Sequence, residues 1–387
     1  MRVIFFTSKL NFETAGGSVP DLDLKVRTLL SFGHNTTVLT VFSERNTYRH
    51  TLPYEVINEQ LSPKMNLYQV QKGVYQLMKK HQHDTDIFHV EGQFVYAAGI
   101  YKMLGGKTPV VIFYNREAVT WIPLMGVFKK TKRLMRVALE KTLGAYIANH
   151  VDHYIFTNPN LQKEYFHFGL SGKFSIMPDF VDPKEKYAAA RMSTPNIERR
   201  GDDKKKIMLF TSGRMIPEKG FELTIRALAL LKHKERFQLT ISGDGPEKDK
   251  LERLSKKLGL AQSISFPGWV PKNELATRLS TTDIFILPKW RMDLTSVLLL
   301  EAMIFAAPCV VPGKSAIAWV AGAGGMPFED NNAEDLAKKI EELVEQPELR
   351  IKLSRGCLER IRELNHVKMG HELERIMFDL QEMNNQK

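Results

Sequence analysis

The sequence predicts an α/β protein built from two doubly wound domains, and three observations carry that prediction. The chain has 387 residues, which suits two domains of ordinary size. Short apolar segments alternate with longer amphipathic ones, the pattern of parallel strands joined by helical crossovers. The alternation stops once, in a charged and aperiodic stretch, and then restarts. We therefore expect two Rossmann-like sheets that bind ligands at the carboxyl ends of their strands.

The first domain is predicted to span residues 1–185. Gly33 is placed to end its first helix. A polar, less regular stretch follows the second strand, from residue 43 to about residue 65. Alternating strands and helices are expected at 2–6 (strand), 21–34 (helix), 35–42 (strand), 65–81 (helix), 86–90 (strand), 91–104 (helix), 109–114 (strand), 128–150 (helix) and 152–157 (strand).

Residues 186–206 are predicted to be a linker, because this stretch is charged and has no periodicity. The second domain should then span residues 207–365. Residues 366–387 are expected to form a C-terminal helix that packs back on the first domain. Strands and helices of the second domain are expected at 206–212 (strand), 218–233 (helix), 237–242 (strand), 246–259 (helix), 263–270 (strand), 283–288 (strand) and 308–311 (strand).

The composition is that of a soluble protein with an anionic partner. Hydrophobic residues make up 43% of the chain and charged residues 26%, with a net charge of +11. Such a charge favours a phosphorylated ligand, an acidic membrane surface or nucleic acid. Nucleic acid is disfavoured, because the basic excess is spread out and no basic stripe with interleaved aromatic residues is present.

The chain carries no sign of secretion or disulfide bonding. Cys309 and Cys357 lie far apart in the sequence and form no disulfide framework or metal-ligand cluster. The N-terminus is typical of a first strand rather than a signal peptide, and no apolar run approaches the roughly 20 residues of a membrane span. We expect a cytoplasmic protein.

Four loops of the second domain each follow a strand, and the first carries two cations. Arg214 and Lys219 flank a proline-containing turn, and a helix begins near Glu218. Cations beside a helix N-terminus suit a diphosphate, because both the charge and the free N–H groups attract an anion. The alternative is that both residues are solvated surface charges.

The second and third loops offer glycines and an aromatic side chain. Gly243 and Gly245 allow close backbone approach, although a plain strand-to-helix turn would need them as well. Trp269 and Val270 follow the next strand and are candidates for contact with a nucleobase. Ordinary packing of Trp269 is the alternative.

The fourth loop raises the question of two acids in an apolar segment. Asp293 and Glu301 lie eight residues apart, a span of about 12 Å if wholly helical. Burying a carboxylate without a partner is costly. Glu301 is either a satisfied core acid or a group that binds a ribose diol, and Asp293 would then bind the sugar of the same ligand. The helix N-terminus between the two acids would face a diphosphate through Thr295, Ser296 and Val297.

Taken in order, these motifs resemble those of the retaining glycosyltransferases of family 4, which have the GT-B fold. The motifs are G-R-x4-K-G at 213–220, G-x-G-P at 243–246, G-W-V at 268–270, D-x-F-x-L-P at 283–288 and acid-x7-E-A-M at 293–303. The resemblance implies two Rossmann-like domains facing a central cleft. It also implies a UDP- or GDP-sugar as donor and retention of anomeric configuration. Because no D-x-D stands plainly beside a strand, we expect no metal.

The resemblance further assigns roles to single residues. Arg214 and Lys219 would bind the donor diphosphate and Glu301 the ribose. Asp293, where the family usually has Glu, would contact the donor sugar at the catalytic centre. Leu294 stands where the family often has glycine.

The first domain would hold the acceptor. Gly16 and Gly17 lie in a loop after the first strand and are candidates for close approach to the donor phosphates or the acceptor, a flexible loop being the alternative. His89 is predicted near the end of its strand as a catalytic group, with a structural histidine as the alternative. In the family this histidine sometimes stands two residues later, where this chain has Glu91. Acceptor contacts are expected from Asn115, Arg116 and Glu117, which follow the strand at 109–114.

Two further features bear on cofactors and partners. The nearest D-x-D, Asp21 to Asp23, opens a helix and is no plain metal site. Residues 128–143 form a basic amphipathic segment that suits an anionic membrane, although an ordinary crossover helix with a solvated face is the alternative. Its basic residues are Lys129, Lys130, Lys132, Arg133, Arg136 and Lys141.

The sequence thus predicts a hexosyltransferase-type enzyme acting on a glycan or lipid-linked envelope acceptor, peripheral to the inner membrane face. Two other readings stay open. A GT-B sugar-nucleotide epimerase would need no acceptor, and an inactive nucleotide-sugar-binding protein would bind without turnover.

Overall fold

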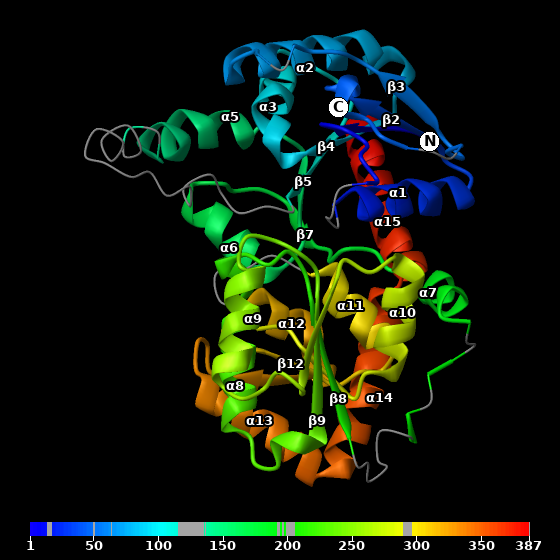
Figure 1. The fold of residues 1–387 in the computed structure, drawn as a ribbon. Coiled ribbons are helices and arrows are strands. Elements are labelled where there is room, and N and C mark those ends of the chain that lie inside the picture. Colours follow the sequence, from blue (N-terminus) through cyan, green and yellow to red (C-terminus); the bar gives the residue numbers. More distant parts are fainter. Residues whose placement is uncertain are drawn as a thin grey trace. The chain divides into compact units, whose positions relative to one another are not determined.

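The computed structural model divides the chain into two compact units, shown in Figure 1. The first comprises Met1–Phe180 and His366–Lys387, and the second comprises Val181–Asn365. The description leaves out residues 14–17, 49–50, 63, 115–134, 136, 192–193, 196, 199–205, 289–295 and 387.

The first unit is built on a seven-stranded parallel sheet with the order β3-β2-β1-β4-β5-β6-β7. The two edge strands, β3 and β7, are additions to the predicted set. Both are short and partly exposed, so they lack the apolar run that marks a buried strand. The strands are β1 (Arg2–Thr7), β2 (Asn35–Thr40), β3 (Glu55–Asn58), β4 (Ile87–Glu91), β5 (Val110–Tyr114), β6 (His153–Phe156) and β7 (Phe174–Ile176).

Helices link these strands, and their starts follow from capping residues. Asn66 and Gln69 form a capping box that begins α2, and the Asn158 side chain accepts from the Leu161 amide at the start of α6. The α-helices are α1 (Ser18–Ser31), α2 (Leu67–His81), α3 (Val95–Met103), α5 (Ala145–Ala148), α6 (Pro159–His167) and α15 (His366–Asn385). Shorter elements are the 3-10 turns η1 (Ser43–Arg45), η2 (Gln82–Asp84) and η3 (Gly92–Phe94) and the π-helix η5 (Glu140–Gly144).

The C-terminal helix α15 packs against α1 within the first unit, and Figure 1 shows the two side by side. Gly370 permits the close approach, because a Cβ there would lie 2.5 Å from Thr28 Cγ2. His34 Nε2 and Glu374 Oε1, 2.7 Å apart, join the turn after α1 to α15. The last helix is therefore part of the first unit's core.

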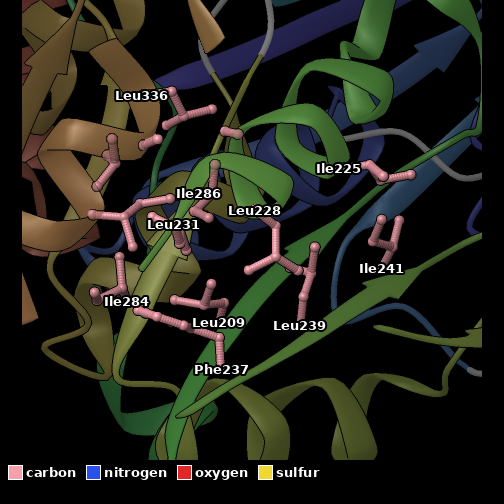
Figure 2. Close-up of a cluster of buried hydrophobic side chains, with 14 of the residues drawn as sticks. Leu209, Ile225, Leu228, Leu231, Phe237, Leu239, Ile241, Ile284, Ile286 and Leu336 are labelled. Carbon is pink, nitrogen blue, oxygen red and sulfur yellow. The ribbon is translucent and has the colours of Figure 1, made fainter. Parts of the chain in front are cut away.

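The second unit has a six-stranded parallel sheet with the order β10-β9-β8-β11-β12-β13. Aliphatic side chains of β8, β9, β11 and α8 interlock in one of its cores, and Figure 2 labels Leu209, Ile225, Leu239 and Ile284 among them. The strands are β8 (Ile207–Ser212), β9 (Phe237–Ser242), β10 (Ile264–Gly268), β11 (Ile284–Ile286), β12 (Cys309–Pro312) and β13 (Gly325–Phe328).

Helices cover both faces of this sheet, as the two separate cores of the unit require. They are α7 (Pro183–Ala189), α8 (Phe221–Leu230), α9 (Lys248–Lys257), α10 (Lys272–Thr281), α11 (Val297–Ile304), α12 (Ala316–Ala321), α13 (Ala333–Glu345) and α14 (Pro347–Leu364), with 3-10 turns η7 (Pro217–Lys219), η8 (Lys234–Arg236) and η9 (Gly322–Gly324).

The boundary between the units lies at Phe180 and Val181, five residues before the expected one, and α7 occupies the start of the predicted linker. Asp182 caps α7, and its Oδ1 accepts from the Lys184 amide at 2.9 Å. Tyr187 packs against the second unit's core. The charges of this stretch conceal its apolar side, and for that reason the sequence pattern favours a linker there.

Candidate functional site

Three loops meet where β8, β9 and β10 end, and backbone hydrogen bonds tie them together. The Gly213 amide donates to Ser242 O at 3.0 Å, and the Met215 amide donates to Asp244 O at 2.7 Å. The Gly243 amide donates to Gly268 O at 2.8 Å. The first three predicted loops therefore form one surface at the carboxyl edge of the sheet.

Two glycines make this junction possible. Gly243 has a φ of 126°, and a Cβ there would lie 1.9 Å from Gly213 O. Gly245 has a φ of 153°, and a Cβ there would lie 2.5 Å from Met215 O. The close approach expected of these glycines is thus an approach of one loop to the next.

Lys219 lies inside this junction, at the end of η7 and directly before Gly220, whose φ is 69°. Its Cδ and Cε run beside Gly213. Burial lowers the pKa of Lys219 from its usual value, because the ammonium loses hydration. Within the described ranges, no carboxylate lies within ion-pair distance of it.

The two neighbouring candidates are exposed. Arg214 stands in solvent beside the same loop. Trp269 is 51% exposed, so ordinary core packing does not account for it. Its ring is free to stack against a planar ligand, while Val270 beside it is half-buried.

The helix α11 carries Glu301, and the structure shows how its carboxylate is accommodated. The Ser296 Oγ caps the helix by accepting from the Leu299 amide at 3.4 Å. The Glu301 side chain is 13% exposed, and its Oε1 lies 2.5 Å from Nζ of Lys186 on α7. The acid therefore has a cationic partner in the fold. The residues expected to precede it in the site, Asp293 and Thr295, lie outside the described residues.

His89 is not at the edge of its sheet. It is the third of five residues in β4 and is only 3% exposed. Its ring lies between those of Phe5, with centroids 4.6 Å apart, and Phe113, at 5.8 Å. Burial, together with the nearby charge of Lys25, lowers the pKa of His89 to about 3. This enclosed, neutral imidazole fits the structural alternative for His89, and its catalytic role stays a prediction.

The strand position two residues later is the one at the edge. Glu91 ends β4, where its Oε1 accepts from Thr7 Oγ1 at 2.5 Å and its Oε2 accepts from the Ser8 amide at 3.3 Å. This carboxylate holds the start of the loop that follows β1. The other candidates of the first unit, Gly16, Gly17, Asn115, Arg116 and Glu117, lie outside the described residues.

Both carboxylates of the D-x-D in α1 make hydrogen bonds and ion pairs within the first unit. Asp21 pairs with Lys25 and also accepts from the Phe180 amide at 2.7 Å. Asp23 accepts from Tyr54 Oη at 2.8 Å and from Arg27 Nε at 2.9 Å. Across the described part of the chain, no cluster of three His, Cys, Asp or Glu side chains has the geometry of a metal site.

Known proteins resemble this chain along both units. The family model described as "Glycosyl transferases group 1" matches residues 193–357, which include every loop described above for the second unit. The lipopolysaccharide core biosynthesis glycosyltransferase LpsE of Rhizobium meliloti is 25% identical over 61% of this chain and 67% of its own length. An uncharacterised glycosyltransferase of Haemophilus influenzae is 25% identical over 84% of this chain and 83% of its own.

Solved structures show the same fold. Sucrose-phosphate synthase from Thermosynechococcus elongatus superposes with a TM-score of 0.75 and 16% identity over 98% of each chain. The Anabaena protein HepE, in complex with UDP, has a TM-score of 0.72 and 15% identity over 98% of this chain and 100% of its own. With two parallel sheets of seven and six strands, these likenesses confirm the predicted two-domain GT-B fold.

Proposed function

We propose that this chain, whose residues 193–357 match the glycosyl transferases group 1 family, moves a sugar from a nucleoside-diphosphate sugar to an envelope glycan or its lipid-linked precursor. The family match supports the transfer reaction. The role of LpsE in lipopolysaccharide core biosynthesis supports the class of acceptor. HepE, which shares the fold, has been solved with UDP and with UDP-glucose, which supports a nucleotide-sugar donor.

The observation that carries the proposal is the partly desolvated ammonium of Lys219 at the junction of three loops. Its lowered pKa means that the fold disfavours the charge it must carry at neutral pH. A diphosphate at this edge would supply the opposite charge and recover that cost. Arg214, which stands in solvent next to the loop, would add a second cation.

The remaining contacts follow from the same edge of the sheet. We infer that Trp269 stacks on the base and that Glu301 accepts hydrogen bonds from the ribose hydroxyls. We also infer that the N-terminus of α11 faces the phosphates. We propose that Asp293 contacts the donor sugar, as the family resemblance implies. During transfer, Lys219 and Arg214 would stabilise the charge that develops on the leaving diphosphate. Because these two cations supply that stabilisation, we propose a reaction that needs no divalent metal and, as the family resemblance implies, retains the anomeric configuration.

We also propose that the first unit touches an anionic membrane through residues 128–146. In the described part of this segment, four large apolar side chains stand in solvent at helical spacing, each between 53% and 70% exposed: Met135, Leu139, Leu143 and Tyr146. The sequence of the same segment is strongly basic. Exposed apolar side chains beside positive charge suit the headgroup region of a bilayer. Among the described helices, none has the length and apolar character to cross one.

A transfer assay tests the proposal. The protein would be incubated with radiolabelled UDP-, GDP-, ADP- and dTDP-sugars and a lipid-linked oligosaccharide fraction, with and without EDTA. We expect one donor to label the acceptor, equally with EDTA, and an α-linked donor to give an α-linked product. Isomerised donor without acceptor labelling would instead indicate an epimerase. Tight donor binding with no product would indicate an inactive binding protein.

A further inference from the structure

The ion pair between Lys186 and Glu301 joins the first helix of the second unit to the helix of the candidate donor site. Lys186 lies on α7, and its side chain is 22% exposed, against 13% for Glu301. The two residues are separated by 115 positions in the sequence. Lys186 also precedes residues 193–357, where the family model matches, so the family pattern does not include it.

A second contact between α7 and α11 supports the ion pair. Tyr187, the next residue on α7, donates from its hydroxyl to Ile304 O at 3.0 Å, and its ring meets that of Phe305 edge to face. Two successive residues of α7 therefore hold α11 at two points. The first touches the functional carboxylate, and the second touches only the end of the helix.

Lys186 uses one oxygen of the Glu301 carboxylate. The contact is to Oε1, and within the described residues Oε2 makes no hydrogen bond. A carboxylate offers about four acceptor positions. A single ammonium on Oε1 therefore leaves capacity on both oxygens for a pair of hydroxyl donors.

We propose that Lys186 is a positioning residue for the nucleotide ribose, an inference that rests on the ribose role proposed above for Glu301. Lys186 holds the Glu301 carboxylate in the rotamer that presents its free acceptor positions. It also balances a negative charge that would otherwise stand near the incoming diphosphate, since like charges at short range repel. The ligand class is a ribonucleoside diphosphate, recognised by its vicinal diol.

The experiment compares ribonucleotides with analogues that lack the diol. Isothermal titration would measure dissociation constants for UDP, GDP and ADP and for the 2′,3′-dideoxy form of each. The variants are Glu301→Gln, Lys186→Met, Lys186→Arg and, as the matched control, Tyr187→Phe. Circular dichroism melting would establish that each variant is folded before titration.

We expect the wild type to prefer one ribonucleotide over its dideoxy analogue by about tenfold or more, as loss of charge-assisted hydrogen bonds implies. Lys186→Met should reduce that ratio by about tenfold while changing the affinity for the dideoxy analogue little. Lys186→Arg should restore the ratio, because it returns a cation to the carboxylate. Tyr187→Phe should lower the melting temperature and leave the ratio unchanged.

The outcomes separate the inference from the proposal beneath it. If Glu301→Gln removes the ribose preference and Lys186→Met keeps it, the positioning role is overturned and the ribose role stands. If Tyr187→Phe reduces the ratio as much as Lys186→Met does, the effect belongs to the docking of α7, and the positioning role is overturned. If the wild type shows no ribose preference for any base, or Glu301→Gln retains it, both the ribose role and the positioning role are overturned.

Discussion

Replacing Lys219 with methionine should weaken nucleotide binding without weakening the fold. Methionine keeps the length of the aliphatic stem that runs beside Gly213 and removes the charge. A charge-assisted hydrogen bond contributes about 1.5–3 kcal/mol. Its loss corresponds to an increase of roughly 10- to 150-fold in the dissociation constant for the diphosphate. The free energy of unfolding should be unchanged or higher, because burial already disfavours the charged lysine.

The same reasoning fixes the sign of the pH dependence. The pKa of Lys219 is lower in the folded protein than in the unfolded chain, so the cost of burying its charge is present below the folded pKa. That cost disappears as pH rises through the folded pKa towards the usual lysine value. Diphosphate affinity should therefore decline at alkaline pH in the wild type and stay flat in Lys219→Met.

Titration calorimetry and urea unfolding measure the two effects on the same preparations. Lys256→Met, on the exposed side of α9, is the control for loss of one positive charge. It should change neither quantity beyond a few tenths of a kcal/mol. A Lys219→Met protein that binds the diphosphate as tightly as the wild type would refute the assigned role. A large loss of stability would refute the argument from burial.

Three other changes test separate parts of the account. Gly243→Ala should lower the free energy of unfolding of the second unit by at least about 2 kcal/mol in urea, because its Cβ would meet a backbone carbonyl. The control Gly259→Ala, whose Cβ would meet no atom within 4 Å, should lower it only by the strain of a φ of 72°. His89→Met should remove a loss of stability in acid, because the pKa of His89 is about 3 in the folded protein and 6.5 in the unfolded chain, so that the wild type loses about 3 kcal/mol between pH 6.5 and pH 4 through this group. If the free energy of unfolding fell equally with pH in the two proteins, the burial of His89 would be contradicted. The double variant Leu139→Ser, Leu143→Ser should reduce the amount of protein that sediments with anionic phospholipid vesicles about tenfold, at unchanged stability because both side chains are exposed. Unaltered sedimentation would show that these two side chains do not contact the membrane.

Strand and helix order followed from the sequence because buried parallel strands are nearly continuous apolar runs. The central strands of both sheets stand where the pattern placed them, and the two-domain α/β class is confirmed. The edge strands β3, β7 and β13 carry no such run, and α7 lies in a stretch whose charges masked its periodicity. Periodicity reports burial, so elements that are half exposed escape it.

Glycines and charges in the sequence predict the loops of the candidate site, but they do not predict which groups these loops contact. Gly243 marks a tight junction in any fold, but its neighbour, Gly213 O, is set by how two strands pair. Lys186 meets Glu301 across 115 residues, and no local pattern links them. His89 lies in the predicted strand, but that strand runs to Glu91, one residue beyond the predicted end, because an apolar run does not establish where a strand stops.

The most direct test of the account is the thermal stability of the protein with UDP, GDP, ADP, CMP and dTDP, each with and without EDTA. A ligand at about 100 times its dissociation constant adds about 2.7 kcal/mol to the free energy of unfolding. For a unit of this size that corresponds to a rise of roughly 5–10 °C in melting temperature. We predict that one nucleoside diphosphate produces this rise equally with EDTA, and that Lys219→Met loses most of it. The absence of a shift with all five nucleotides would contradict the donor site at the carboxyl edge of the second sheet.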